Sequence, residues 1–229
     1  MLPLDSAQMN DRWATFDCYG TLIDWNLGLR TAMEGLWPKA DGAALLARYH
    51  EREPEVEAGR GIPYRQVLAE TLAKVAEAED LAVPPGRSQA LAESLPSWPA
   101  FSEVPDALRR LRDAGWRLAI LSNTDPDLLD ASLRQIGVPV DLRVVASEIG
   151  SYKPAPGHWE TFFERSGAER ARHIHVAASL YHDVQPCVAL GLRCVWINRL
   201  DEESDLPRAG ELVDLSGLPE RMEELVPAG

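Results

Sequence analysis

Residues 13–21, Trp-Ala-Thr-Phe-Asp-Cys-Tyr-Gly-Thr, place one carboxylate at the point where an apolar run meets a tight turn. The apolar residues predict a buried strand at about 13–17, and Gly20 lets the chain reverse directly after it. In open parallel α/β sheets, ligands bind beyond the carboxyl ends of the strands, so Asp17 is placed to act as a nucleophile. A solvated aspartate that caps a turn explains the same segment equally well.

A second apolar run, residues 117–124, ends in two short polar side chains. Ser122 and Asn123 can hydrogen-bond an anionic group without adding charge. Pro126 then suits the first turn of a helix. The sequence therefore predicts a second strand whose end carries substrate-binding groups.

Two later segments supply a cation and a second acid. Lys153 lies between Gly150 and Pro154, in a stretch that is neither regular helix nor central strand. Residues 173–183 are typical of another apolar strand, followed by a turn that places Asp183 at the rim of the sheet. A solvated loop lysine is the alternative interpretation of Lys153.

Asp17, Ser122, Lys153 and Asp183, each at a strand end or in the loop beyond it, resemble in order and spacing the four motifs of the haloacid dehalogenase superfamily. The resemblance covers almost the whole chain. In the superfamily's metal-dependent phosphatases, a second Asp follows the nucleophile by two residues, and another Asp in the fourth motif helps to hold magnesium.

This chain has Tyr19 and Ala178 at those two positions. Magnesium needs hard oxygen ligands, and neither a phenol nor a methyl group replaces a carboxylate. The Asp-Cys-Tyr-Gly-Thr segment instead resembles the Asp-x-Tyr-Gly-Thr signature of the 2-haloacid dehalogenase branch, as do Leu-Ala-Ile-Leu-Ser-Asn, Tyr-Lys-Pro and Cys-Val-Trp-Ile-Asn-Arg. The resemblance implies a metal-independent hydrolase without a cofactor, similar to the (S)-2-haloacid dehalogenases.

The roles that this resemblance implies agree with the chemistry of the residues. Asp17 would attack the α-carbon of a small 2-halo carboxylic acid, and water would hydrolyse the resulting ester to a 2-hydroxy acid. Lys153 would keep Asp17 ionised, while Asp183 would organise Lys153 or the water. Thr21 and Ser122 would orient Asp17 or bind the substrate carboxylate, together with backbone N–H groups.

Five further residues are predicted to bind substrate: Tyr19, Trp25, Arg48, Asn123 and Ser179. In the dehalogenase branch, an arginine on the first cap helix helps to hold the halide, and Arg48 lies in about that region; a solvated helix arginine is the alternative. Tyr19 and Trp25 would wall the pocket. Better-known members carry Ser-Ser-Asn before the last Asp, and Ser179 would supply part of that polar cluster here.

Proline and glycine punctuation predicts two parts. Residues 25–99 are expected to form a small helical cap divided at positions that include Pro54, and residues 1–24 and 100–229 an α/β core. Later strands are expected at 144–145, 175–176 and 194–197. Because helices separate the strands, we expect parallel pairing with right-handed crossovers, hence a doubly wound, Rossmann-like sheet.

Composition limits the partners and the compartment. The net charge of −13 disfavours binding to nucleic acid or to an anionic membrane, and we expect a small carboxylic acid as the partner. The sequence leaves open whether the protein forms a homodimer. Three cysteines without metal-ligand spacing, and no signal-peptide pattern, indicate the cytoplasm. Cys18 is expected in the core, and His173 and His175 at the surface on either side of a buried Ile174.

Three alternatives remain for the function. The same nucleophile opens a small-ring imino acid instead of expelling halide. A magnesium-dependent phosphatase retains Asp17 and Asp183 and completes its metal site with water or another side chain. A non-catalytic binding protein uses the same scaffold, because fold does not fix function.

Overall fold

A parallel six-stranded sheet forms the centre of the molecule, in the order β3-β2-β1-β4-β5-β6. The computed structural model describes residues 11–57 and 60–228; residues 1–10, where no signal-peptide pattern was found, lie outside them. The strands are β1 (Arg12–Phe16), β2 (Trp116–Ser122), β3 (Leu142–Val145), β4 (His173–Ala177), β5 (Cys194–Ile197) and β6 (Gly210–Leu212).

The strand order confirms the predicted doubly wound α/β fold. The chain builds outward from β1 through β2 to β3, and then outward in the other direction from β4 through β5 to β6. The order therefore reverses between β1 and β4, and the crevice beyond their carboxyl ends is where such sheets bind ligands. The short strand β6 was not predicted, because its three residues, Gly-Glu-Leu, carry no apolar pattern.

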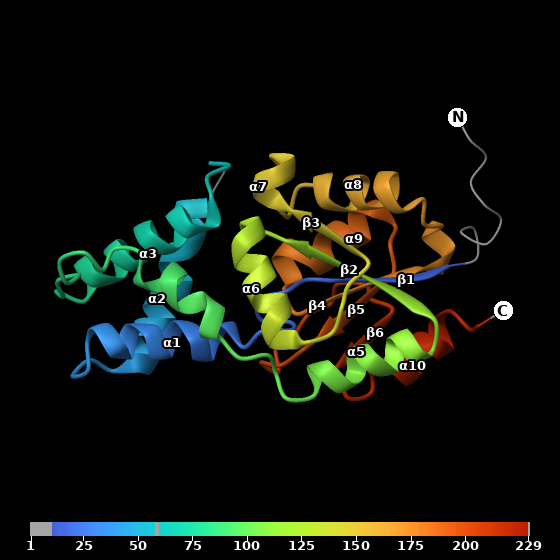
Figure 1. Cartoon of the computed structure of the whole chain (residues 1–229), viewed down its shortest axis with the longest axis horizontal. Helices are drawn as coiled ribbons and strands as arrows, with labels where there is room; N and C mark the ends of the chain where they lie inside the picture. The colour runs from blue at the N-terminus through green and yellow to red at the C-terminus, as the bar shows by residue number, and fades with distance from the viewer. Residues whose placement is uncertain (1–10, 58–59, 229) are drawn as a thin grey trace.

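Helices cover both faces of the sheet (Figure 1). On one side lie α5 (Val104–Asp113) and α10 (Leu218–Leu225), and on the other α7 (Ala146–Ile149), α8 (Gly157–Ser166) and α9 (Gln185–Leu190). The remaining elements of this part are α6 (Pro126–Ile136), a 3₁₀ turn at Arg170–Arg172 and a π-helical turn at Leu180–Val184. Helices cover the central strands on both faces of the sheet, which explains why every residue of β1 and β4 is buried.

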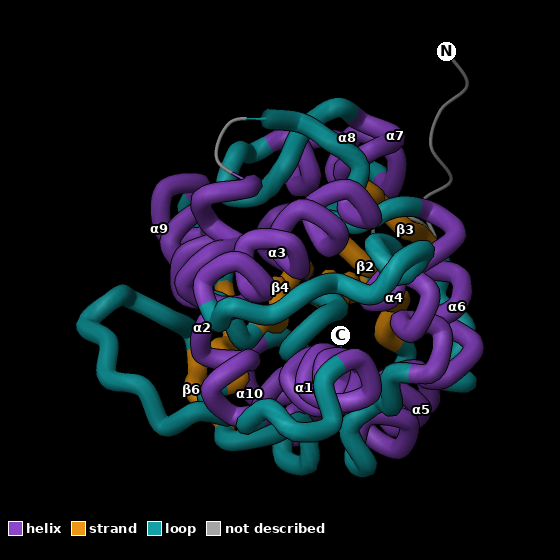
Figure 2. The backbone as a smooth tube through the Cα atoms, turned by 90° about the vertical axis from the view of Figure 1, so that its left-hand side faces the viewer, coloured by secondary structure: helices purple, strands orange, loops and turns teal. Residues whose placement is uncertain are grey.

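The segment predicted as a cap is helical. It contains α1 (Trp25–Leu36), α2 (Gly42–Glu57), α3 (Tyr64–Ala78), α4 (Ala90–Ser94) and a 3₁₀ turn at Leu95–Ser97. These helices gather at one end of the sheet in Figure 1, and Figure 2 shows them in front of the strands. Pro54 was expected to divide two helices, which is wrong: it lies inside α2, which gives up the N–H bond of residue 54 to the His50 carbonyl and ends three residues later.

A core aspartate holds the start of the cap helix α3. The Tyr64 backbone N–H donates to Asp125 Oδ1 at 3.1 Å, and the Arg65 N–H donates to Asp125 Oδ2 at 3.0 Å. The helix has Pro63 at its own cap position, which offers no side-chain hydrogen bond. Asp125, which is 4% exposed, therefore satisfies N–H groups that an N-terminal turn otherwise leaves without partners.

One glycine of α1 allows a close approach between two parts of the cap segment. A Cβ placed on Gly28 would lie 2.3 Å from a ring carbon of Trp98, whereas one on Gly35 of the same helix would meet nothing within 4 Å. The ring of Trp98 thus takes the space of a side chain at residue 28. None of the helices in the described part of the chain combines the length and apolar character that a membrane span needs.

Candidate active site

Asp17 and Asp183 are delivered by the two strands between which the sheet order reverses. Asp17 directly follows β1, and its backbone N–H donates to Val176 O at 3.1 Å, which continues the pairing of β1 with β4. Asp183 lies in the π-helical turn after β4. The Ser179 hydroxyl caps that turn by accepting from the His182 N–H at 3.1 Å. Both acids therefore reach the crevice from adjacent strands.

Lys153 joins the two acids. Its Nζ donates to Asp17 Oδ1 at 2.9 Å and to Asp183 Oδ1 at 2.7 Å. The side chain of Lys153 is 2% exposed, that of Asp17 11% and that of Asp183 0%. Asp17 is thus the member of this ion triad, Asp17–Lys153–Asp183, that is most open to a ligand.

The charges of the triad stabilise one another. Burial alone lowers the pKa of the Lys153 ammonium, but the two carboxylates outweigh burial and raise that pKa above its ordinary value. Burial acts in the opposite sense on Asp183, yet the charge of Lys153 and a hydrogen bond from His175 hold its pKa below the ordinary value. Lys153 is therefore charged and Asp183 ionised at neutral pH.

Thr21 supplies the second hydrogen bond to Asp17. Its hydroxyl donates to Asp17 Oδ2 at 2.8 Å and accepts from the Ala178 N–H at 2.9 Å. Each carboxylate oxygen of Asp17 then has one donor, from Lys153 or from Thr21, and retains lone-pair capacity for attack. The structure brings together Asp17, Thr21, Lys153 and Asp183.

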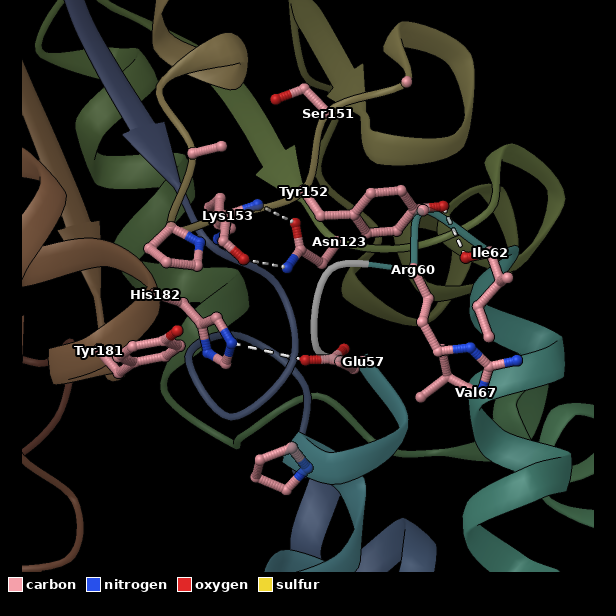
Figure 3. A pocket seen from close by; sticks show the side chains of 15 residues that line it. Glu57, Arg60, Ile62, Val67, Asn123, Ser151, Tyr152, Lys153, Tyr181 and His182 are labelled. Carbon is pink, nitrogen blue, oxygen red and sulfur yellow. Dashed lines mark hydrogen bonds and ion pairs between the residues drawn. The ribbon is translucent and has the colours of Figure 1, made fainter.

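Asn123 lines the first of the two cavities described below and fixes the lysine loop. Its Nδ2 donates to Lys153 O at 2.9 Å, and its Oδ1 accepts from the Lys153 N–H at 2.7 Å (Figure 3). Both polar groups of the side chain are occupied by one residue. These bonds position Lys153, and the contact of Asn123 with substrate stays a prediction.

Two cavities lie near the triad. One of about 540 Å³ is lined by residues that include Lys153, Glu57 and His182, and the last two lie 3.5 Å apart across it (Figure 3). The other, of about 470 Å³, is lined by residues that include Tyr19 and Trp25. Asp17 itself is in the lining of neither cavity; Lys153 of the first cavity donates to it, and Tyr19 of the second is two residues away along the chain.

The predicted wall residues line the second cavity. Tyr19 stacks on Tyr64, with ring centres 5.8 Å apart, and its hydroxyl bonds the Ser132 hydroxyl at 3.1 Å. Burial raises the pKa of Tyr19, which keeps the phenol protonated. Trp25 stacks on His50 at 5.0 Å and donates its indole N–H to Tyr64 Oη.

Two predicted hydroxyls have different surroundings. Ser179 also lines the second cavity, but its oxygen serves the turn that carries Asp183. The Ser122 hydroxyl is buried and has no hydrogen-bond partner among the described residues. It retains a donor for a bound anion.

The structure does not bring Arg48 to the site. Its guanidinium pairs with Glu51 and, at 2.9 Å, with Glu79, both in the cap segment, and it lines neither cavity. His50, two residues later on α2, faces the second cavity instead. Burial lowers the pKa of His50, so this ring adds no charge at neutral pH.

The expectation of surface positions for His173 and His175 is wrong. Both are fully buried, because β4 is a central strand with helices on both faces. His175 Nε2 lies 2.9 Å from Asp183 Oδ1, so it belongs to the site. Sequence reasoning missed this contact, although two histidines spaced by two in an apolar strand share one face.

The residues do not fit a magnesium site of the phosphatase kind. No group of three or more His, Cys, Asp or Glu side chains able to hold a metal occurs within residues 11–57 and 60–228. Tyr19 is engaged with Ser132, and Ala178 offers only backbone groups, which Thr21 and Trp196 occupy. A lysine ammonium, instead of a metal ion, lies between the two carboxylates.

Comparison with known proteins gives consistent matches. The family model described as haloacid dehalogenase-like hydrolase matches residues 12–191. The chain is 29% identical to haloacetate dehalogenase H-2 of Moraxella sp. strain B, over 80% of this chain and 84% of that protein. It is 27% identical to (S)-2-haloacid dehalogenase 1 of Pseudomonas sp. strain CBS-3, over 91% and 95%.

A solved structure shares the fold. The L-2-haloacid dehalogenase from Xanthobacter autotrophicus with chloropropionic acid covalently bound superimposes with a TM-score of 0.81 and 20% identity, covering 92% of this chain and 97% of that one. The strand order, the positions of Asp17, Lys153 and Asp183, and the family model that spans most of the chain lead to one conclusion: this protein belongs to the haloacid dehalogenase-like hydrolase family.

Proposed function

We propose that this hydrolase cleaves the carbon–halogen bond of small 2-halo carboxylic acids without a metal ion. The observation that carries the proposal is Lys153 Nζ, bonded to Asp17 Oδ1 and Asp183 Oδ1 at 2.9 and 2.7 Å in a buried site. A carboxylate held by one lysine and one threonine hydroxyl is oriented for direct displacement at carbon. The names of the relatives support the same substrate class.

In the first step, an Asp17 oxygen attacks the α-carbon. The new carbon–oxygen bond forms as the carbon–halogen bond breaks, and the halide leaves with the bonding pair. The product is an ester between Asp17 and the 2-substituted acid. We assign the Ser122 hydroxyl, which has no partner among the described residues, as a donor to the substrate carboxylate. This carboxylate has to be held by local donors because the chain carries a net charge of −13.

In the second step, water hydrolyses the ester. Asp183 accepts a proton as the water oxygen attacks the Asp17 carbonyl carbon, and the bond from that carbon to the substrate oxygen then breaks. The proton returns to this oxygen and the 2-hydroxy acid leaves, while Asp17 releases the remaining proton of the water to solvent and is restored as a carboxylate. Lys153 balances the charges of both acids during these steps.

The test is halide release from chloroacetate and from each enantiomer of 2-chloropropionate, with a metal chelator present throughout. Wild-type protein is expected to release halide, and Asp17→Asn to release none while keeping its circular dichroism spectrum. Intact-protein mass spectrometry should detect the ester on Asp17 in quenched wild-type samples. Halide release by an Asp17→Asn variant that has not deamidated would refute the mechanism.

A second candidate, ring opening of a small-ring imino acid, is favoured by the pair formed by Glu57 and His182. These side chains lie 3.5 Å apart in the cavity that Lys153 lines, and the arginine expected to hold halide, Arg48, is directed elsewhere. A nitrogen leaving group needs a proton, which a carboxylate–imidazole pair can deliver and a halide does not require. Here Asp17 would attack the ring carbon as the carbon–nitrogen bond breaks, and His182 would protonate the nitrogen.

Product analysis separates the two candidates. A four-membered-ring imino acid is incubated with wild type and His182→Gln, in parallel with chloroacetate. If wild type opens the ring, His182→Gln does not, and neither releases halide from chloroacetate, the ring-opening reaction is the function and the halide proposal is refuted. Halide release that is retained by His182→Gln would favour the halide proposal.

A further inference from the structure

A buried row of hydrogen-bonded side chains leads away from Asp183. His175 Nε2 lies 2.9 Å from Asp183 Oδ1, and its Nδ1 lies 2.8 Å from the Thr15 hydroxyl, which also lies 2.8 Å from His173 Nε2. All four side chains have no exposed surface. The register of β1 and β4 pairs Thr15 with His175, which places the three strand residues on one face of the sheet.

One assignment of protons gives every bond of the row a donor and an acceptor. An ionised Asp183 only accepts, so His175 Nε2 carries a proton and donates to it. With the proton of His175 on Nε2, its Nδ1 accepts from the Thr15 hydroxyl. The Thr15 oxygen in turn accepts from His173 Nε2, and His173 is neutral because burial lowers its pKa. The row runs from His173 to Asp183 with every donor matched to an acceptor.

The row determines which oxygen of Asp183 is free. Oδ1 accepts from both Lys153 Nζ and His175 Nε2. Oδ2 is buried and has no partner among the described residues. Two donors from different elements on a single oxygen fix the rotation of the carboxylate and leave Oδ2 as the acceptor.

We infer that His175 is a positioning residue, which holds Asp183 so that Oδ2 receives the proton of the hydrolytic water. The part of the inference that concerns water rests on the proposed function. Packing alone does not explain the choice of histidine, because a phenylalanine would contact the neighbouring Trp159 ring, 5.3 Å away, without two nitrogens to satisfy.

Among the titratable groups around His175 and Asp183, the charge of Lys153 lowers the pKa of Asp183 the most. His158 on α8 has its pKa lowered to about 4, chiefly by burial, and its Nε2 lies 3.1 Å from Ser122 O. His173 faces Arg170 and Arg193, whose charges also lower its pKa. Asp17 reaches Asp183 only through Lys153. Removal of His175 is therefore expected to change the pKa of Asp183 through the loss of their hydrogen bond.

The experiment compares His175→Phe, His175→Gln and His173→Phe. The first removes the donor to Asp183, the second restores an N–H donor, and the third removes an equally buried ring that lies two hydrogen bonds further from Asp183. Titration of ¹³C-labelled aspartate carboxyls by NMR is expected to give an Asp183 pKa about one to two pH units higher in His175→Phe than in wild type. His175→Gln should reverse most of this rise, and His173→Phe should show little of it.

Single-turnover kinetics provides the second measurement. Ester formation on Asp17 is expected to keep its rate in His175→Phe, while ester hydrolysis slows by roughly ten- to a hundredfold and the ester accumulates in the mass spectrum. An unchanged Asp183 pKa in His175→Phe, or equal losses in His175→Phe and His173→Phe, would overturn the inference. Absence of ester in wild type would refute the proposed function instead, and the NMR titration would still decide the role of His175.

Discussion

Replacing Lys153 by methionine removes the only charge that compensates two buried acids in the triad. The distances of 2.9 Å to Asp17 and 2.7 Å to Asp183 correspond to about 6 kcal/mol of attraction per pair at an effective dielectric constant of about 20. Desolvation of the charges cancels much of this. Breaking a buried ion pair by removing one partner typically costs about 3–5 kcal/mol, which is the loss expected for Lys153→Met at pH 7.5.

The loss is expected to depend on pH. In wild type, the lowered pKa of Asp183 gives stability that is present at neutral pH and is lost as the pH falls through the folded-state value. The raised pKa of Lys153 gives stability that is lost only as the pH rises through its folded-state value. Without Lys153, burial raises the pKa of Asp183, so the variant gains stability on acidification. The difference from wild type should therefore shrink between pH 7.5 and pH 5.

Urea unfolding followed by tryptophan fluorescence at both pH values measures the difference. Lys74→Met is the matched control, because Lys74 is 44% exposed and its partner Glu55 lies 3.3 Å away at the surface. This control should unfold at nearly the wild-type urea concentration, because exposed ion pairs contribute little. A Lys153→Met variant as stable as wild type at pH 7.5, or one that loses more at pH 5 than at pH 7.5, would refute the reasoning.

Three further substitutions test other parts of the structure. Asn123→Ala removes two hydrogen bonds to the lysine loop, so the free energy of unfolding should fall by about 1–3 kcal/mol and turnover by up to about a hundredfold, measured by urea unfolding and halide release. Arg48→Ala should keep halide release within about twofold of wild type, because its ion pairs lie at the cap surface; a larger loss would show that the side chain reaches the substrate. Gly28→Ala forces a methyl group into Trp98 and should destabilise the folded protein by about 1–3 kcal/mol. Gly35→Ala, exposed on the same helix, should stabilise it by about 0.5–1 kcal/mol. Equal effects of the two substitutions in thermal unfolding would contradict the contact between Gly28 and Trp98.

The strand-end acids could be predicted from the sequence, because the position of a side chain after a buried strand depends on local pattern. Asp17 and Asp183 follow apolar runs, and parallel strands bring their ends to one edge of the sheet. Lys153 could be added because its order along the chain matches the family motifs. The joint hydrogen bonds of Lys153 to both acids are a tertiary feature and needed the structure.

The sequence predicts that the cap is helical, but it does not predict which side chains of each cap helix face the cavity. Successive residues of a helix turn by about 100°, so Arg48 and His50 point in nearly opposite directions. An uncertainty of two residues in the helix phase therefore decides which side chain reaches the cavity. The strand β4 posed a different difficulty, because the burial of His173 and His175 depends on its central place in the sheet, which is set by β1 and β5 on either side.

Asp125 anchors the cap to the core at the start of α3, and Gln135 of α6 anchors it a second time at the Pro96 carbonyl. Both carboxylate oxygens of Asp125 hold N–H groups of the first turn of α3, and Tyr152 of the lysine loop donates to the Ile62 carbonyl at 2.7 Å just before that turn. Translation of the cap away from the sheet would break all of these bonds at once, whereas rotation about the bonds at the start of α3 would break none of those bonds. A swing of the cap about the start of α3, which would admit substrate and release product, is therefore expected to require release of the Pro96 carbonyl from Gln135 Nε2, 2.8 Å away.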